Sequence, residues 1–371
     1  MNDRTLCVPC LLGLEGPIAD ELKRLGLSDV KNENGRVYFR GGDDAIARAN
    51  INLRVGERVL LELGRFYAVS FDELFEKTKA LPWETLIPKD AAFPVKGYSL
   101  NSKLFSVSDC QKIIKKAVVE RLRSVYGIEW FPETAETYQI QFSIMKDCVS
   151  VCVDTSGAGL HKRGYRPAHN AAPLKETMAA AMVMLSRYRG REDFCDPFCG
   201  SGTVPIEAAL IAKNRAPGLN RGFSAQYWQG FDKNAFDRAR EEARDKEFNG
   251  NYRIIGSDID ANALSIAREN AERAGVADIV RFEKADAMKF ARATENGIIV
   301  TNPPYGERIM EKQEAESLYR GFGEAWRNTE NWKLYLLSSH TEFERCFGRT
   351  ADKKRKLYNG MIKCDLFMYL K

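Results

Sequence analysis

The spacing of hydrophobic positions predicts two small α/β modules in the first 155 residues of the chain. Apolar residues that recur every three to four positions indicate amphipathic helices, and strict alternation indicates half-buried strands. The first module, 1–58, is predicted to contain elements at 6–8, 15–25 and 44–53 and a hairpin around Asn34-Gly35. The second, 59–155, is predicted to contain elements at 59–63, 93–98, 108–126, 138–144 and 149–154, with a helix opened by Ser70, a helix end at Gly127 and a hairpin turn at Lys146-Asp147.

The segment that follows these modules has little periodicity. Residues 156–173 contain three glycines, two prolines and several basic side chains, among them Arg163 and Arg166. Glycine and proline punctuate regular structure, so we predict a linker over 156–172.

From residue 173 onward the pattern changes to a regular alternation of strands and helices. A helix is predicted to begin at Pro173, and a polar insertion of about forty residues with a helix around 231–248 interrupts the alternation. The other predicted elements are at 194–198, 204–212, 254–256, 261–274, 280–283, 298–301, 334–337 and 363–370. Such alternation predicts a doubly wound, mostly parallel sheet, whose ligands lie beyond the carboxyl ends of its strands.

Composition narrows the class of protein. Hydrophobic residues make up 44% of the 371 residues, charged residues 29%, and the mean hydropathy is -0.39, which excludes a disordered chain and predicts no membrane span. The beginning of the chain does not resemble a signal peptide, and nine scattered cysteines indicate reduced thiols. We therefore expect a cytoplasmic protein with no metal site, and a net charge of +5 is compatible with nucleic acid.

The turn from Asp196 to Thr203 carries the first chemical signal. It leaves a predicted strand and enters a helix through Gly200 and Gly202, where missing Cβ atoms let the backbone approach a ligand. A dinucleotide fingerprint would need glycine at Pro205, and no P-loop lysine follows. The turn is therefore a ligand loop, and nucleotide hydrolysis is excluded.

Two acidic residues follow the next two strands. Asp258 is placed to accept hydrogen bonds from both ribose hydroxyls of an adenosine, and Asp286 to take the adenine amino group. Each acid alone could equally be a helix cap or a solvated loop residue. In strand order after the glycine loop, the two together predict an adenosine-containing ligand.

The strongest motif follows the predicted strand 298–301. Two successive prolines, Pro303 and Pro304, force the chain out of the sheet with the Pro303 carbonyl unpaired. That oxygen and the amide oxygen of Asn302 can accept from one exocyclic amine, while Tyr305 offers a stacking face to a flipped base. Two acceptors would restore sp3 character to the amine nitrogen as a methyl group approaches, so no general base or metal is needed.

These motifs resemble a known family. The last 200 or so residues resemble class I S-adenosylmethionine-dependent methyltransferases that methylate amines, through DPFCGSGT, GSDID, KADA and TNPPYGER. NPPY-type motifs are shared by adenine-N6 and guanine-N2 enzymes, so the motif does not name the base. LHKRGYR, PLKETMAAAM and LR-x3-RVLLEL resemble bacterial THUMP-domain rRNA methyltransferases, and in particular the portion of the large-subunit enzyme that makes N2-methylguanosine in 23S rRNA.

The resemblance implies a fold, a cofactor and a partner. It implies a ferredoxin-like segment over 1–58, an RNA-binding THUMP domain over 59–155 and a Rossmann-like class I methyltransferase domain over 173–371. It also implies S-adenosylmethionine as cofactor, large-subunit rRNA as partner and a single methyltransferase activity. By motif, the expected cofactor contacts are Thr177, Asp196, Phe198, Gly200, Gly202, Asp258, Ile259, Asp286 and Ala287. Phe198 departs from the commoner pattern, which has glycine there.

Basic residues supply a weaker indication of RNA binding. Lys112, Lys115 and Lys116 share one face of the predicted helix 108–126, and we expect them to contact phosphates together with Arg163 and Arg166 of the linker. An ordinary solvated basic face is the alternative, as it is for the run at 353–356.

Two other functions remain open from the sequence. One is an adenine-N6 methyltransferase on RNA or DNA, and the other is a non-catalytic RNA-binding assembly factor. Only about sixty residues follow Gly306, too few for the separate target-recognition region of a DNA enzyme, so RNA is favoured. The oligomeric state is left open.

Overall fold

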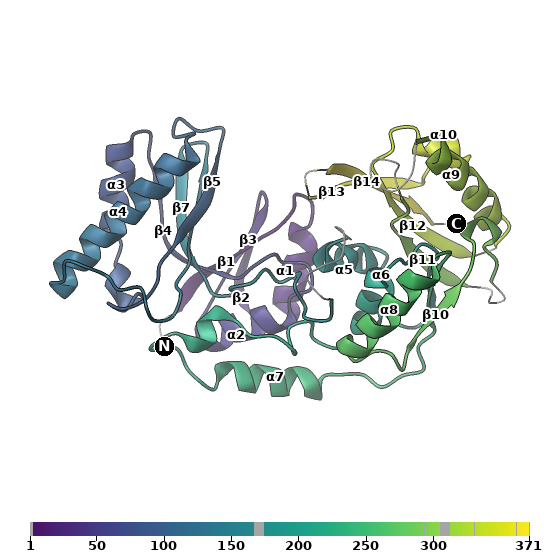
Figure 1. The fold of residues 1–371 in the computed structure, drawn as a ribbon, viewed down its shortest axis with the longest axis horizontal. Coiled ribbons are helices and arrows are strands. Elements are labelled where there is room, and N and C mark those ends of the chain that lie inside the picture. The colour runs from purple at the N-terminus through teal and green to yellow at the C-terminus, as the bar shows by residue number, and fades with distance from the viewer. Residues whose placement is uncertain are drawn as a thin grey trace.

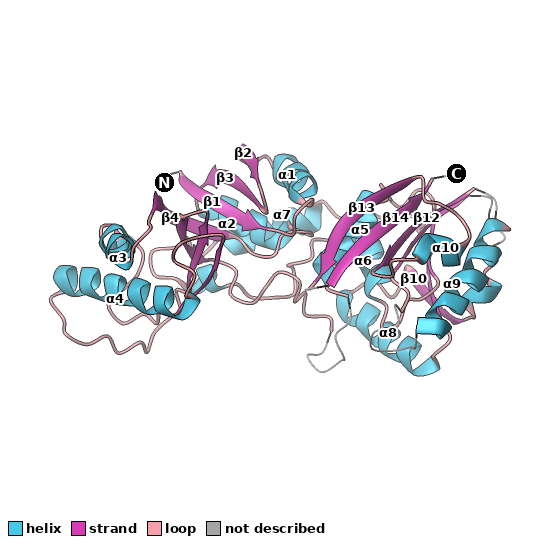
Figure 2. Cartoon of the chain, turned by 90° about the horizontal axis from the view of Figure 1, so that it is seen from above, coloured by secondary structure: helices cyan, strands magenta, loops and turns pink. Residues whose placement is uncertain are grey.

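The computed structural model describes residues 3–166, 174–292, 294, 296–304, 312–329, 331–360 and 362–370. They form two seven-stranded sheets that lie side by side along the long axis of the molecule (Figures 1 and 2). The helices of the first half are α1 (Glu15–Arg24), α2 (Asp43–Asn52), α3 (Phe71–Lys79) and α4 (Val107–Tyr126). Within the described residues, no helix is both long and apolar enough to span a membrane.

The first sheet joins the two modules that the sequence predicts. Its order is β2-β3-β1-β4-β7-β6-β5, and β1 pairs antiparallel with β4 through Leu6 and Leu61. The strands are β1 (Arg4–Pro9), β2 (Ser28–Glu33), β3 (Arg36–Gly41), β4 (Leu60–Tyr67), β5 (Val95–Leu100), β6 (Ile140–Met145) and β7 (Cys148–Asp154). The ferredoxin-like and THUMP modules therefore share one hydrogen-bonded sheet, which local periodicity cannot reveal.

Local signals placed the ends of these elements correctly. The Ser70 hydroxyl accepts from the Glu73 amide at 3.2 Å and caps α3, and Gly127 ends α4 in the left-handed region. Lys146 and Asp147 both have positive φ and join β6 to β7, as expected of a two-residue hairpin.

The second sheet has the predicted doubly wound architecture. Its order is β10-β9-β8-β11-β12-β14-β13; the first five strands are parallel, and β14 pairs antiparallel with both β12 and β13. The strands are β8 (Asp193–Asp196), β9 (Ile254–Asp258), β10 (Val280–Lys284), β11 (Gly297–Thr301), β12 (Trp332–Ser338), β13 (Lys353–Asn359) and β14 (Ile362–Tyr369). Its longer helices are α5 (Glu176–Leu185), α6 (Thr203–Ala212), α8 (Ala261–Ala274) and α9 (Lys312–Arg327), with the short α10 (Phe343–Phe347).

Two of these elements correct or extend the sequence analysis. The basic run at 353–356, which the sequence analysis assigned to no element, lies in the outer strand β13, which hydrogen-bonds to β14. Helix α9 was not anticipated, although Ala315, Tyr319, Phe322 and Trp326 are buried at the spacing of one helical face.

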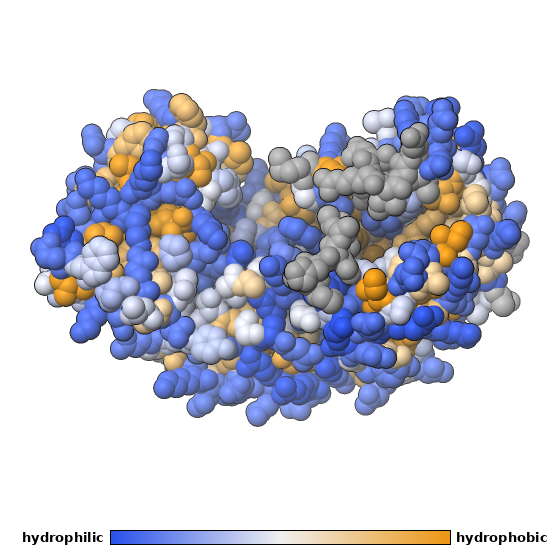
Figure 3. All heavy atoms as spheres, in the orientation of Figure 1, coloured by the Kyte–Doolittle hydropathy of each residue, from blue (hydrophilic) through white to orange (hydrophobic). Residues whose placement is uncertain are grey.

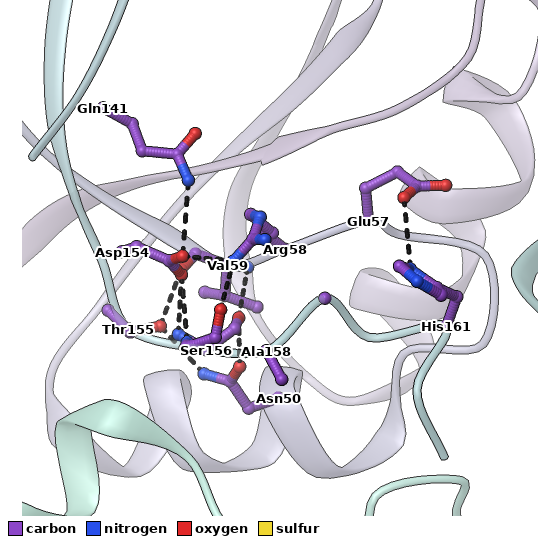
Figure 4. Close-up of polar contacts among 12 residues, drawn as sticks. Asn50, Glu57, Arg58, Val59, Gln141, Asp154, Thr155, Ser156, Ala158 and His161 are labelled. Carbon is purple, nitrogen blue, oxygen red and sulfur yellow. Dashed lines mark hydrogen bonds and ion pairs between the residues drawn. The ribbon is translucent and has the colours of Figure 1, made fainter. Parts of the chain in front are cut away.

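The segment predicted to be a linker has no helix or strand over 156–166, but several of its side chains are buried. Ser156, Leu160 and Tyr165 are buried. Its beginning is held by the buried Asp154, which ion-pairs with Arg58 and accepts from the Ser156 amide at 2.9 Å (Figure 4). Polar side chains and backbone thus satisfy each other here without a regular element, so the segment is part of the core.

The polar insertion provides a second set of contacts between the two halves of the molecule. Its helix α7 (Ala235–Asp245) packs beneath α2 (Figure 1). Glu242 pairs with Arg48 at 2.7 Å, and Arg238 pairs with Asp44 at 2.6 Å. The second half therefore contacts the first half through both α7 and the segment 156–166.

Candidate functional site

The predicted ligand residues meet at the carboxyl edge of the second sheet. Parallel pairing of β8 with β9 and with β11 brings the ends of these strands together, and they carry Asp196, Asp258 and Thr301. The Asp258 carbonyl also accepts from the Ala285 amide at 3.1 Å, which joins the loop before Asp286 to the same edge.

The two loop glycines do different work. A Cβ at Gly202, whose φ is +84°, would lie 2.9 Å from the Cβ of Ala267 and 3.0 Å from the ring of Phe282. A Cβ at Gly200, with φ of +51°, would meet nothing within 4 Å. Gly202 therefore allows α6 to pack closely against α8, whereas Gly200 leaves an open cradle where a ligand can approach the backbone.

Asp258 is tied to this loop. One of its carboxylate oxygens accepts from the Gly200 amide at 2.9 Å and the other from the Asp260 amide at 3.0 Å. Asp260 in turn caps α8 through the Asn262 amide. The Asp258 carboxylate is half-buried and already oriented, and its remaining lone pairs fit a pair of ribose hydroxyls.

Asp196 is a buried carboxylate with neutral partners. It accepts from the Thr301 hydroxyl at 2.6 Å and from the Phe198 amide at 3.1 Å. No arginine or lysine among the described residues lies within ion-pair distance of it. Burial raises its pKa to about 7, with a smaller contribution from the negative charge of Asp258. Such a group fits the ammonium of a methionine moiety, which would supply the missing positive charge.

The adenine end of the predicted site carries exposed apolar side chains. Ile259 is 67% exposed and Met288 44% exposed, and they follow the paired strands β9 and β10. Asp286 accepts from the Met288 amide at 2.9 Å, while Ala287 is buried. Asp286 thus does act as a cap, and the exposed Ile259 and Met288 follow the same two paired strands.

The amine-site motif leaves β11 next to Asp196. Pro303 is buried, and Asn302 and Pro304 are half-buried. The Pro304 carbonyl accepts from the hydroxyl of Tyr319 at 2.8 Å. Tyr319 is a buried residue of α9 that packs edge-on against His340 and Phe343. The helix α9 therefore positions the proline turn, a role that sequence reasoning missed; Tyr305 lies outside the described residues.

Phe198 does not simply fill the place of a glycine. Its ring packs edge-on against Phe322 of α9, with centroids 5.2 Å apart. The aromatic residue therefore anchors the glycine loop to the helix that also holds the proline turn, which gives a physical reason for the departure from the commoner pattern.

The first module reaches the beginning of α5. The Thr177 hydroxyl, predicted to contact a cofactor carboxylate, donates to the carboxylate of Glu57 at 3.1 Å. Lys175 lies 3.6 Å and His161 3.8 Å from the same carboxylate, and Figure 4 shows His161 pointing toward it. Burial alone would raise the pKa of Glu57, but these partners hold it below its usual value.

Arg163 and Arg166, which were expected to contact RNA, are both engaged within the fold. Arg163 is buried and lies 3.5 Å from the buried Glu207. Arg166 pairs with Glu176 at 3.0 Å and donates to the Thr203 hydroxyl at 2.8 Å. Each arginine lies beside a buried carboxylate, so both compensate negative charge inside the fold and connect the starts of α5 and α6.

The three lysines of α4 do not form one uniform surface. Lys112 and Lys116 are exposed. The Lys115 ammonium lies 3.5 Å from the centroid of the Phe93 ring and pairs with Glu133, so it is engaged within the fold. RNA contact by Lys112 and Lys116 stays a prediction.

Among the described residues, no group of three metal-ligating side chains comes together.

Three family models match consecutive parts of the chain. They are described as the RlmL ferredoxin-like domain at residues 5–60, the THUMP domain at 68–154, and the RMKL-like methyltransferase domain at 163–367. Among curated proteins, "Putative RNA methyltransferase YpsC" of Bacillus subtilis is 45% identical over 100% of this chain and 96% of its own length. The ribosomal RNA large subunit methyltransferase K/L of Psychromonas ingrahamii is 33% identical over 98% of this chain, which spans 49% of that protein.

Solved structures agree over the whole chain. A crystal structure from Listeria monocytogenes, described as a predicted N6-adenine-specific DNA methylase, is 47% identical with a TM-score of 0.93, covering 100% of this chain and 96% of that one. SMU.472, described as a putative methyltransferase complexed with SAH, is 40% identical with a TM-score of 0.92, covering 100% and 98%. A relative of this similarity with S-adenosylhomocysteine bound identifies S-adenosylmethionine as the cofactor of this chain.

Proposed function

Since this chain belongs to the RlmKL-like family of RNA methyltransferases, we propose that it methylates the exocyclic N2 amine of a guanine in RNA, with 23S rRNA as the target. The observation that carries the proposal is the Asn302–Pro304 turn. It leaves β11 beside Asp196 and is braced by Tyr319. The methionine end of the cofactor site and the acceptors for an amine therefore lie at one strand end.

The chemistry assigned to the chain is orientation rather than proton abstraction. S-adenosylmethionine would supply the methyl group: the nitrogen–carbon bond would form as the sulfur–carbon bond breaks, S-adenosylhomocysteine would leave, and the proton lost by the amine would pass to water. The Asn302 amide oxygen and the Pro303 carbonyl accept hydrogen bonds from the two N–H groups of the target amine. These hydrogen bonds turn the lone pair of the amine nitrogen out of the plane of the base. Asp196, Asp258 and Gly200 hold the donor end at the same edge, so the two reactants meet in a fixed geometry.

The shape of the molecule is compatible with a large substrate. Figure 3 shows a hollow between the two halves at the upper edge of the view. A THUMP domain, the mildly basic chain and the large-subunit rRNA target named for the Psychromonas relative all support RNA.

Adenine-N6 methylation is the second candidate. It is favoured by the description of the Listeria relative, and the Asn-Pro-Pro motif serves both amines. The two candidates differ in the product.

Nucleoside mass spectrometry separates them. RNA from cells with and without this protein is digested, and the same analysis follows incubation of deficient rRNA with the purified protein and S-adenosylmethionine. We expect N2-methylguanosine from the 23S fraction in both experiments. N6-methyladenosine as the product would support the second candidate instead. If no RNA is methylated, a non-catalytic RNA-binding assembly factor would remain as the function.

A further inference from the structure

The first sheet leaves one face without a helix. Leu6, Leu61, Val153 and Ile140 are aligned by pairing, buried, and share a core with α1 to α4. The side chains on the opposite face come from the alternate positions of the same strands. The second face carries a small buried cluster of its own, Cys7, Tyr38, Leu60 and Cys152, to which no helix of the described residues contributes.

A polar groove of about 360 Å³ crosses this uncovered face. Its lining includes the acidic Glu33 of β2 together with Arg36 of β3, Arg65 of β4, Ser143 and Met145 of β6, and Ser150 of β7. The pairing of Arg65 with Ser150, and of Ser143 with Ser150, confirms that these side chains point to one side of the sheet.

Arg36 is the unusual residue of the groove. It is only 8% exposed, yet its guanidinium donates to neutral groups: the Ser143 hydroxyl at 2.9 Å, the Tyr98 hydroxyl at 3.0 Å and the Tyr38 hydroxyl at 3.3 Å. The Met145 sulfur lies 3.8 Å away. A buried charge is costly unless an opposite charge compensates it.

The nearby carboxylates are engaged elsewhere. Glu33 accepts two hydrogen bonds from Arg65, at 2.9 and 2.6 Å, and Glu62 accepts from Ser150 at 3.1 Å. No described Asp or Glu lies within ion-pair distance of Arg36. Arg36 is therefore a fixed, oriented cation with only neutral hydrogen-bond partners, in a groove whose charged lining also includes the Glu33–Arg65 pair.

Exposed aromatic rings stand on the same face. Tyr98 pairs in register with Ser143 and is 42% exposed, and Tyr67 pairs with Cys148 and is 68% exposed. Rings on an open sheet beside a cation are the combination that holds single-stranded RNA, because bases stack on the rings while phosphates meet the charge.

We propose that this groove binds a phosphate of a single-stranded RNA segment at Arg36, with neighbouring bases stacked on Tyr67 and Tyr98. This inference rests on the RNA substrate proposed above and adds a second contact point on the first sheet, outside the site of methyl transfer. It holds the substrate without taking part in the chemistry.

Met145 offers a direct test. In Met145→Glu a carboxylate is placed within reach of Arg36 and fills the role of the missing anion, whereas Met145→Gln is a neutral match in shape. RNA affinity is measured by fluorescence anisotropy at several salt concentrations. We expect Met145→Glu to bind rRNA fragments about tenfold more weakly, with a salt slope reduced by about 0.7 for one lost single-strand phosphate contact. Met145→Gln should stay within about twofold of the wild type, as one neutral substitution leaves the phosphate contact in place.

Two further readouts guard against a folding defect. Both variants should bind S-adenosylhomocysteine like the wild type in calorimetry, and Met145→Glu should melt no lower than Met145→Gln because it compensates a buried charge. Independently, the exposed Tyr67→Ala should weaken RNA binding about tenfold, as expected for a lost stacking platform. Tyr227→Ala, at a tyrosine that is 59% exposed on the insertion, is its control.

The outcomes are separable. Equal RNA affinity in the two Met145 variants would overturn the groove assignment, and so would equal RNA affinity in Tyr67→Ala and Tyr227→Ala. If the wild-type enzyme still transfers the methyl group, the proposed function is unaffected by either result. Inorganic phosphate is expected to bind far more weakly than RNA, and binding of comparable strength would assign the groove to free phosphate and overturn the RNA assignment. Absence of both RNA binding and methyl transfer in the wild type would remove the proposed function as well.

Discussion

Asn302 directly follows the end of β11, at the start of the turn that Tyr319 of α9 contacts through the Pro304 carbonyl. If its amide oxygen accepts from the target amine mainly as the methyl group transfers, removing it should affect the rate rather than cofactor binding. We expect Asn302→Ala to lower the single-turnover rate on rRNA by about 10²–10³, with unchanged affinity for S-adenosylhomocysteine. The exposed Asn249→Ala should keep the wild-type rate. A fully active Asn302→Ala enzyme would contradict the amine-site mechanism.

Asp196 provides a pH test at the same scale. Burial raises its pKa from 3.8 to about 7, so the folded protein holds a proton there that the unfolded chain releases. Its contribution to stability is therefore lost as pH rises through this range. A bound ammonium favours the carboxylate, so cofactor affinity should increase between about pH 6 and about pH 7.5, with release of a proton. Calorimetry in buffers of different ionisation heat measures this, and Asp196→Asn should show neither the increase nor the proton release.

At the scale of elements, the glycine loop connects β8 to α6 with two glycines whose surroundings differ. Gly202→Ala would place a methyl group 2.9 Å from Ala267 in a left-handed conformation, and we expect a loss of about 2 kcal/mol or more in stability. Gly200→Ala meets open space, so its stability cost should be about 1 kcal/mol. Its cofactor affinity should nevertheless fall about tenfold, since the added methyl group occupies the cradle. Equal cofactor affinity in Gly200→Ala and the wild type would remove the loop from the site.

Helix α4 supplies a prediction about RNA. Lys112 and Lys116 are exposed, whereas Lys115 is held over Phe93. Lys112→Gln with Lys116→Gln should therefore weaken RNA binding and reduce its salt slope by about 0.9 per duplex phosphate contact, without moving the methylated position. Lys115→Gln should instead lower the melting temperature and leave the slope unchanged. A wild-type slope in the double variant would identify this face as an ordinary solvated one.

At the scale of the whole molecule, buried charges join the two halves. Arg163 donates to the carbonyl of Arg54 in the first module and lies beside Glu207 of α6, which also accepts from Tyr165 at 3.1 Å. Truncating only the cation leaves a buried carboxylate unpaired. We expect Arg163→Met to cost about 3–5 kcal/mol in chemical denaturation, and Arg163→Met with Glu207→Leu to recover much of that loss. A double variant no more stable than the single one would show that packing, not charge, holds this junction.

What the sequence by itself determined is local. Caps such as Ser70 and Asp260, the left-handed ends at Gly127 and Gly275, and the Lys146-Asp147 hairpin depend on interactions within a few residues, so short patterns suffice to place them. The strand-by-strand order of Asp196, Asp258 and Asn302 likewise follows from a parallel sheet, which aligns successive strand ends at one edge.

What only the tertiary structure decided involves partners far apart in the chain. The fusion of two modules into one sheet depends on β1 meeting β4, and the burial of Arg163 depends on a carboxylate 44 residues away. The sequence does not distinguish a basic side chain that contacts RNA from one that compensates a buried carboxylate. Arg36 shows the converse, because its lack of a carboxylate partner became visible only when strands from both modules enclosed it. Long-range pairing and desolvation, rather than local preference, set these roles.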